Sequence, residues 1–423
     1  MASDAAPVAR AGGDALAPDH RRGVALCLSG GGYRAALFHL GSLRRLNELG
    51  VLAKVDTITS VSGGSILAGF LAHHLAEGTG SWPPESGIVP EWERGVAAPM
   101  RAMARSNIRT RTVLSRFGPN VWRRRHGFEN ALAAQSGGRM ADLAFRDLPQ
   151  RPRFVMCATD LEFGDQWVFD SGHRRLGSSK AGYLHEPSAD WTLLSAVAAS
   201  CCVPYLCPPV RVKGMAEHFQ GGSYRADDRP ARVARIDLTD GGMFDNLGLE
   251  PVWRDHAVLL VSDGAPTYAT VQNARPTWRG LRQFIILLDQ ATDVRRRWLL
   301  SSIAHQELRG TRWQIGTVPH GDDAGQSRRR YSDHIVDEYI SRTRIDLDSF
   351  SQGEIAVIEN HGYLTTDVAI GRDFDYLSGG IRPPAAPPHP EWMEEDRARQ
   401  ALRNSSKVTL LGRGLVPVRP RGS

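Results

Sequence analysis

A serine at a turn between a strand-like and a helix-like segment is the first residue that could do chemistry. Residues 60–64 read Ser-Val-Ser-Gly-Gly, with Ser62 at the centre. A serine on such a turn presents its hydroxyl outward, and adjacent glycines permit strained torsions and close approach of a substrate. The following helix points its N-terminal dipole at the site, which favours developing negative charge. The usual pattern is G-x-S-x-G, and Ser60 replaces its first glycine. A Ser-Gly-Gly turn alone is more often structural than catalytic, so Ser62 is a candidate nucleophile that needs partners.

Three successive glycines earlier in the chain could supply hydrogen-bond donors to an oxyanion. Residues 30–34 read Gly-Gly-Gly-Tyr-Arg and again join a strand-like run to a helical one. Consecutive glycine N–H groups can converge on one anion. With Ala35 the run also satisfies the dinucleotide fingerprint G-x-G-x-x-A, which further requires an acidic residue at the end of the next strand. Asp56 lies at the start of that strand instead, so the sequence argues against dinucleotide binding.

An Asp-Gly-Gly turn at residues 240–242 offers a base for the serine. Most such turns are purely structural. A carboxylate held beside the hydroxyl in a partly dry site, however, can have its pKa raised enough to accept the proton. Asp240 is therefore the candidate base. A Ser–Asp–His order is also available, but in a chain with 14 histidines such an order is easily found by chance. The histidines that would complete it are His256, His305, His334 and His361.

The elements that must position these turns alternate between strand and helix. Apolar runs predict strands, and leucines at helical spacing predict helices. The predicted strands are residues 24–28, 55–61, 154–159, 257–262 and 284–288, and the predicted helices are 33–49, 66–74 and 193–200. Strand, tight turn and helix in repeated succession indicate an α/β fold with a mostly parallel sheet.

The chain of 423 residues divides into one large domain and two tails. Residues 1–21 are rich in alanine and proline and predict a flexible N-terminal tail. The catalytic domain is expected over residues 22–378. Residues 379–423 have a proline-rich linker composition followed by a tail, with a short charged helix near residues 391–404.

Composition excludes several classes of protein. No stretch approaches the about 18 uninterrupted apolar residues of a membrane-spanning helix, and the first residues lack the apolar block of a secretory signal. The 5 cysteines contain no CxxC pair, which argues against a structural zinc site and a disulfide scaffold. The cytoplasm is the expected location. No metal-binding motif stands out, and no cofactor is expected.

An arginine-rich insertion occupies about residues 95–130. Its basic residues alternate with apolar ones, and the arginines are Arg101, Arg105, Arg109, Arg111, Arg116, Arg123, Arg124 and Arg125. Such a mixture can lie on an anionic lipid surface. A solvated insertion whose apolar side packs on the domain is an equally good interpretation. We expect the insertion, within a chain of net charge +6, to help dock the protein on membranes.

Together the three motifs resemble the patatin-like phospholipase family, whose hallmarks are G-G-G-x-R, G-x-S-x-G and D-G-[GA]. They occur in the family's order as residues 30–34, 60–64 and 240–242. Weaker similarities are present at residues 158–164, 198–210, 344–350 and 361–363, so the resemblance spans roughly residues 23–370.

The resemblance implies a three-layer α/β/α sandwich and a Ser–Asp dyad without histidine. Ser62 would attack a lipid ester carbonyl, and Asp240 would take its proton. The backbone amides of Gly30, Gly31 and Gly32 would hold the oxyanion, which is worth about 3 kcal/mol per donor.

Lipids are the partners that this reading implies. The expected substrates are phospholipids or lysophospholipids at a membrane surface, and no nucleic-acid polymer is expected. Arg34 would either brace the glycine loop or bind a lipid phosphate, and a structural salt bridge is an equally good interpretation. Two alternatives stay open. One is a non-catalytic lipid-binding module, and the other is a membrane-degrading effector gated by a small anionic activator, as in some bacterial members that act in anti-phage defence and respond to cyclic nucleotides.

Overall fold

The computed structural model describes residues 20–78, 81–114, 127–204, 207–212, 216–265, 279–318, 330–379, 382–403 and 405. Its strands are β1 (Val24–Leu28), β2 (Thr57–Val61), β3 (Arg153–Asp160), β4 (Asp165–Asp170), β5 (Arg175–Ser178), β6 (Gly182–His185), β7 (Val210–Arg211), β8 (Asp237–Asp240), β9 (Val258–Asp263) and β10 (Arg309–Gln314). Its α-helices are α1 (Gly32–Glu48), α2 (Gly63–Glu77), α3 (Ala98–Ala104), α4 (Ile108–Leu114), α5 (Gly127–Gln135), α6 (Leu193–Ser200), α7 (Arg229–Val233), α8 (Gly242–Asp245), α9 (Arg279–Ala304), α10 (Asp333–Ile335), α11 (Gln352–Asp373) and α12 (Glu395–Leu402).

The described strands form one sheet in the order β10-β9-β1-β2-β3-β4-β5-β6, with β8 beside β3 and β7 beside β8. Strands β10, β9, β1, β2 and β3 run parallel. Strands β4 to β8 extend the sheet with antiparallel pairs that the sequence did not predict. The central strands β1 and β2 are buried along their whole length, as is typical of parallel strands covered on both faces.

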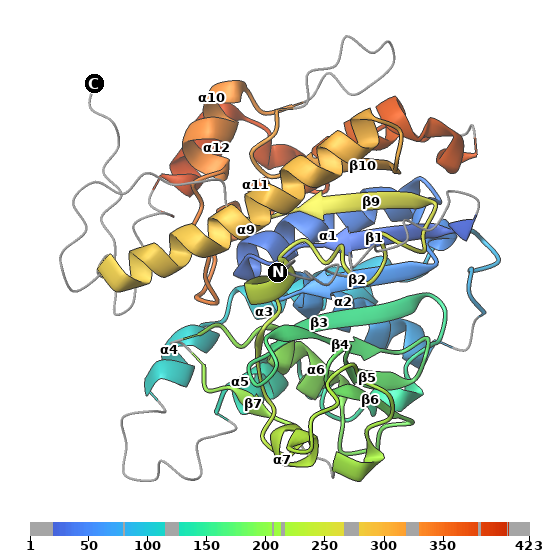
Figure 1. Ribbon diagram of the computed structural model, residues 1–423. Coiled ribbons are helices and arrows are strands. Elements are labelled where there is room, and N and C mark those ends of the chain that lie inside the picture. The colour runs from blue at the N-terminus through green and yellow to red at the C-terminus, as the bar shows by residue number, and fades with distance from the viewer. Residues whose placement is uncertain are drawn as a thin grey trace, which may run out of the picture.

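Successive side chains of β1 belong to two different cores, which shows that both faces of the sheet are covered. Leu26 and Leu28 pack into the large core shared with α1, α2 and α6. Ala25 and Cys27 point the other way, into a smaller core that includes Leu299 of α9. Figure 1 shows α9 crossing one face of the sheet while α1 and α11 lie on the other. The fold is therefore the expected three-layer α/β/α sandwich.

Most of the predicted elements are confirmed. The strands predicted at 24–28, 55–61, 154–159 and 257–262 correspond to β1, β2, β3 and β9, and the helix at 193–200 is α6. The prediction of a strand at 284–288 is wrong, because these residues lie inside α9. A short apolar run fits a buried strand and a buried helical segment equally well, and only its length and flanks distinguish the two.

The segment predicted to be a linker packs onto the domain instead. Arg45 of α1 donates a hydrogen bond to the carbonyl oxygen of Pro383 at 2.7 Å, and Tyr363 of α11 accepts one from the amide of Ala386 at 3.1 Å. Ala398 and Leu402 of α12 are buried. Residues 382–403 therefore form a strap over α11, although their proline content suggested a free connection. Residues 1–19 of the predicted N-terminal tail and the end of the chain after residue 405 lie outside the described residues.

No helix in the described ranges is long and apolar enough to cross a bilayer.

Candidate active site

Ser62 occupies a strained turn between β2 and α2. Its backbone has φ 50° and ψ −119°, a region that residues other than glycine rarely adopt. The turn is held from both sides: the Ser62 amide donates to Ser200 Oγ at 2.9 Å, and the Ser62 carbonyl accepts from Cys201 Sγ at 3.0 Å. Side chains at Gly63 and Gly64 would overlap the carbonyl oxygens of Gly32 and Leu28. The glycines are needed because neighbouring backbone passes so close.

Ser60, which departs from the usual motif, has a specific place in this turn. Its side chain is buried, and its hydroxyl accepts a hydrogen bond from Ser65 Oγ at 2.9 Å. Ser65 Oγ is also 2.8 Å from Ser200 Oγ, and Ser200 in turn holds the Ser62 amide. The extra hydroxyl is therefore satisfied inside a chain of serines that supports the turn.

Sheet geometry explains why Asp240 lies close to Ser62. Strand β2 pairs with β3 only as far as Val61 beside Cys157. Beyond that point β8 pairs with the same edge of β3 in the antiparallel direction, with Asp240 opposite Ala158. The last residue of β8 and the residue after β2 therefore meet at one edge, although they are distant in the sequence.

The Asp240 carboxylate is buried and only partly satisfied. Its Oδ1 accepts a hydrogen bond from the Gly242 amide at 2.8 Å, whereas its Oδ2 has no hydrogen-bond partner in the described structure. Burial raises the pKa of Asp240 to about 6, against the opposing effects of the Ser62 hydroxyl and the Gly242 amide. A carboxylate with such a pKa is suited to accepting a proton near neutral pH.

The glycine loop supplies donors from Gly31 and Gly32 but not from Gly30. The Gly30 amide donates to the carbonyl oxygen of Asn246 at 3.0 Å, so the prediction that it binds an oxyanion is wrong for this conformation. Gly31 (φ 140°) and Gly32 (φ 61°) line the same cavity as Ser62, and their amides have no acceptor among the described residues.

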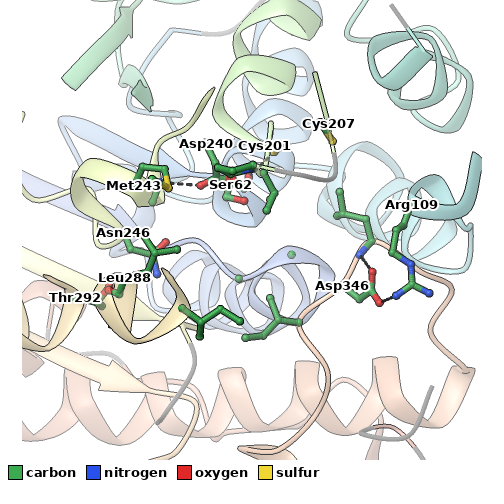
Figure 2. A pocket seen from close by; sticks show the side chains of 18 of the residues that line it. Ser62, Arg109, Cys201, Cys207, Asp240, Met243, Asn246, Leu288, Thr292 and Asp346 are labelled. Atoms are coloured by element: carbon green, nitrogen blue, oxygen red, sulfur yellow. Dashed lines mark hydrogen bonds and ion pairs between the residues drawn. The ribbon is translucent and has the colours of Figure 1, made fainter. Parts of the chain in front are cut away.

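A cavity of about 340 Å³ collects these groups (Figure 2). Ser62, Asp240, Gly31 and Gly32 all line it. Much of the remaining wall is apolar and includes Phe128, Val203, Met243, Ile285, Leu288 and Leu347. A concave, mostly apolar pocket with a few convergent polar groups is the usual form of a binding site for a hydrophobic ligand.

Arg34 braces the loop and does not face the cavity. Its side chain is buried and donates to the carbonyl oxygens of Ser341 (3.2 Å), Thr343 (2.9 Å) and Gly264 (3.1 Å). Burial lowers its pKa to about 10. The expectation of a contact with a lipid phosphate is therefore wrong, and backbone carbonyls take the place of the salt bridge that the sequence also allowed.

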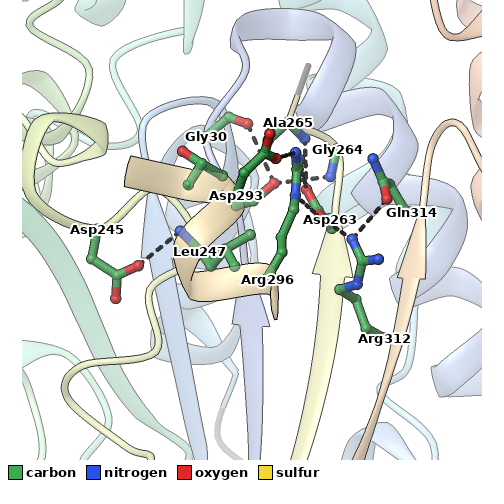
Figure 3. Close-up of polar contacts among 12 residues, drawn as sticks. Gly30, Asp245, Leu247, Asp263, Gly264, Ala265, Asp293, Arg296, Arg312 and Gln314 are labelled. Atoms are coloured by element: carbon green, nitrogen blue, oxygen red, sulfur yellow. Dashed lines mark hydrogen bonds and ion pairs between the residues drawn. The ribbon is translucent and has the colours of Figure 1, made fainter. Parts of the chain in front are cut away.

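Helix α9 forms one wall of the cavity and is fixed by a buried ionic network (Figure 3). Arg296 donates to both carboxylate oxygens of Asp263, at the end of β9, over distances of 2.8 and 3.0 Å. Arg312 of β10 donates to the same carboxylate at 2.8 Å. These arginines hold the pKa of Asp263 below its ordinary value despite burial. The Asp263 carboxylate therefore links β9, α9 and β10 through its ion pairs.

The histidines named as alternatives lie away from the site. None of them lines the cavity. His256 is hydrogen-bonded to Thr57 Oγ1 at 2.9 Å, and His361 to the carbonyl oxygen of Ile315 at 2.8 Å.

Two arginines in the described part of the arginine-rich insertion form ion pairs. Arg109 lines the cavity and pairs with Asp346 and Asp348, and Arg101 pairs with Glu359. Arg123, Arg124 and Arg125 lie outside the described residues, so membrane docking by this insertion stays a prediction.

Sequence reasoning missed the cavity residues contributed by α9 and by residues 345–347. Ile285, Leu288, Asp289 and Thr292 follow helical spacing. That periodicity could have identified a lining face had the segment been recognised as a helix. Residues 345–347 fall within the weaker family similarity at residues 344–350, which did not indicate that they line the cavity.

The family model for patatin-like phospholipases matches residues 26–253, more than half of the chain. The chain belongs to this family. The patatin-like match includes the glycine loop, the serine turn and the Asp-Gly-Gly turn in their expected order. Among curated protein sequences, none matches significantly.

Solved structures, a cytosolic phospholipase A2 among them, are similar to this patatin-like chain at low identity. Human GIVD cytosolic phospholipase A2 is 13% identical, with 91% of this chain and 63% of that chain covered and a TM-score of 0.40. VipD from Legionella pneumophila is 12% identical, with 82% and 66% covered and a TM-score of 0.35. The chain thus spans less than two thirds of the length of these structures.

Proposed function

We propose that this patatin-like protein hydrolyses carboxylic esters of phospholipids or lysophospholipids through Ser62 and Asp240. The observation that carries the proposal is the meeting of a strained serine and a buried, half-satisfied carboxylate in one apolar cavity. Strain and an unmet hydrogen bond are costs that folding alone does not require, and both are common at catalytic sites.

Acylation begins with attack of Ser62 Oγ on the ester carbonyl carbon, while the hydroxyl proton passes to Asp240 Oδ2. The carbonyl electron pair moves onto oxygen, where the amides of Gly31 and Gly32 stabilise it. Collapse of the tetrahedral intermediate breaks the ester C–O bond. The departing alcohol, a lysolipid or a glycerol derivative, takes the proton from Asp240 and leaves an acyl-serine.

Deacylation repeats the chemistry with water. Asp240 takes a proton from a water molecule that attacks the acyl-serine carbonyl, and the same amides hold the second oxyanion. Release of the fatty acid returns the proton to Ser62 Oγ. The apolar wall formed by residues such as Phe128 and Leu288 would hold the acyl chain during both steps.

Labelling with a serine-directed fluorophosphonate, followed by mass spectrometry and lipid hydrolysis assays, tests the proposal. We expect the adduct on Ser62, and a loss of at least about a thousandfold in fatty-acid release for Ser62→Ala and for Asp240→Asn. Ser301→Ala, which changes an exposed serine on α9, is the matched control and should retain activity. Wild-type rates in either site variant would refute the assignment. Lipid binding without turnover would favour a binding module, and turnover only after addition of an anionic nucleotide would favour a gated effector.

A further inference from the structure

A carboxylate without a partner projects from the α9 wall of the cavity. Asp289 lines the cavity and makes no hydrogen bond or ion pair with any residue that the structure describes. Ile285 and Thr292, one turn before and after it, line the cavity as well. Residues at this spacing share one helix face, so Asp289 belongs to the face that α9 turns toward the cavity.

No described side chain forms a direct ion pair with Asp289, and the nearby charges offset its burial only in part. Burial raises its pKa; Arg282 and Arg296 act in the opposite direction, and Asp293 adds to the rise. Arg296 is already bonded to Asp263 and to Asp293. A half-buried carboxylate without a partner is costly, and a cation bound beside it would remove that cost.

The charges on the described part of the cavity wall point in the same direction. Among the residues that the structure describes, four Asp and Arg side chains line the cavity: Arg109, Asp240, Asp289 and Asp346. Arg109 and Asp346 form an ion pair and cancel. The remaining two are carboxylates, so the described part of the cavity wall is acidic inside a protein whose net charge is +6. An anionic headgroup entering this space would meet repulsion, and a cationic group would meet attraction.

We propose that Asp289 forms a subsite for the ammonium group of a zwitterionic lipid headgroup, such as choline or ethanolamine. This inference rests on the proposed ester hydrolysis, because it assigns the polar end of the same substrate. The acyl chain would lie along the apolar wall with its ester at Ser62, and the ammonium would pair with Asp289 on α9. The subsite selects lipids that carry a positive charge beyond the phosphate over lipids that carry only negative charge.

Short-chain lipids below their micellar concentration provide the test, since they remove the effect of a charged surface on a basic protein. The rates kcat/KM for dihexanoyl phosphatidylcholine and dihexanoyl phosphatidylglycerol are measured for wild type and for Asp289→Asn. We expect wild type to prefer the choline lipid. In Asp289→Asn the ratio of the two kcat/KM values should fall about tenfold, mainly through KM for the choline lipid. Asp289→Lys should invert the preference.

Two controls make the result specific. Asp289→Glu keeps the charge and should keep the preference, whereas Asp227→Asn removes an exposed carboxylate elsewhere and should change nothing. An unchanged ratio in Asp289→Asn and Asp289→Lys, with both lipids still hydrolysed, overturns the subsite and leaves ester hydrolysis standing. Failure of the wild type to cleave either lipid or p-nitrophenyl hexanoate refutes the proposed function itself.

Discussion

At the scale of single residues, the burial of Asp240 determines how well its carboxylate can act as a base. The carboxylate is buried and is bonded on one oxygen only. In bulk water it would be a weak base near neutral pH, whereas burial moves its pKa into the range where a base is effective. The same burial also destabilises the folded protein, and both effects can be measured.

The pH dependence of the rate should follow ionisation of Asp240. Because the ionised carboxylate accepts the serine proton, kcat/KM for a soluble ester should fall about tenfold per pH unit below the pKa of about 6. The measurement is kcat/KM from pH 4.5 to 8. A rate that stays constant down to pH 4.5 would show that another group is the base.

Asp240→Asn should stabilise the protein at high pH while abolishing turnover. The folded pKa of about 6 lies above the ordinary 3.8, so ionisation is unfavourable in the folded state. This penalty is absent below pH 3.8 and complete above about pH 6. Removing it should add on the order of 2–3 kcal/mol to the unfolding free energy at pH 8 and almost nothing at pH 4. Urea unfolding at both pH values checks this, with Asp227→Asn as control. A variant less stable than wild type at pH 8 would contradict the argument.

At the scale of elements, the crossing of α1 and α11 fixes the helix that carries the glycine loop at its start. A side chain at Gly41 would overlap the carbonyl oxygen of Glu359, and one at Gly362 would overlap that of Phe38. The two helices therefore meet backbone to backbone. Any widening of this contact would shift α1, and Gly31 and Gly32 with it.

Gly362→Ala should consequently reduce the unfolding free energy by about 2–3 kcal/mol through overpacking. Gly78→Ala is the matched control, because the nearest atoms to its added methyl group are 3.6 Å away. Thermal or urea unfolding measures both. Equal stability of the two variants would show that α11 can move away without cost.

The elements also show how far the sequence predicts this molecule. The serine turn could be predicted because its strand, its glycines and its helix are contiguous, so local rules suffice. The wall containing Asp289 could not, since an apolar run at 284–288 has no local signal that separates helix from strand. Arg34 shows a further limit: a buried arginine can be satisfied by carbonyl oxygens from residues far away in the chain, and no motif records them.

At the scale of the whole molecule, the strap of residues 382–403 closes the surface of α11. Asn360 donates to the carbonyl oxygen of His389 at 2.7 Å, and the His389 ring contacts the buried Glu359 carboxylate at 2.9 Å. Trp392 packs against Gly353 at the start of α11. The strap therefore covers polar and apolar groups that would otherwise be exposed to water.

A variant that ends at residue 379 should be markedly less stable than one that ends at Ser405, which keeps the strap. Loss of the strap uncovers α11 and removes one partner of Glu359, so we expect a decrease in Tm of at least about 5 °C or loss of soluble protein. Differential scanning calorimetry of the two variants decides. Identical melting temperatures of the two variants would show that residues 382–403 add no stability, as expected of a linker.

The family match ends at residue 253, before the chain forms β9 and before α9 closes the cavity. The groups proposed for bond cleavage thus lie inside the matched stretch, and the wall proposed to choose the headgroup lies beyond it. The later stretch also supplies the carbonyl oxygens of Gly264, Ser341 and Thr343 that hold Arg34, so exchanging the whole stretch between relatives would disturb the glycine loop together with the headgroup wall. Single substitutions in the wall, such as those at Asp289, would change headgroup choice while leaving that support in place.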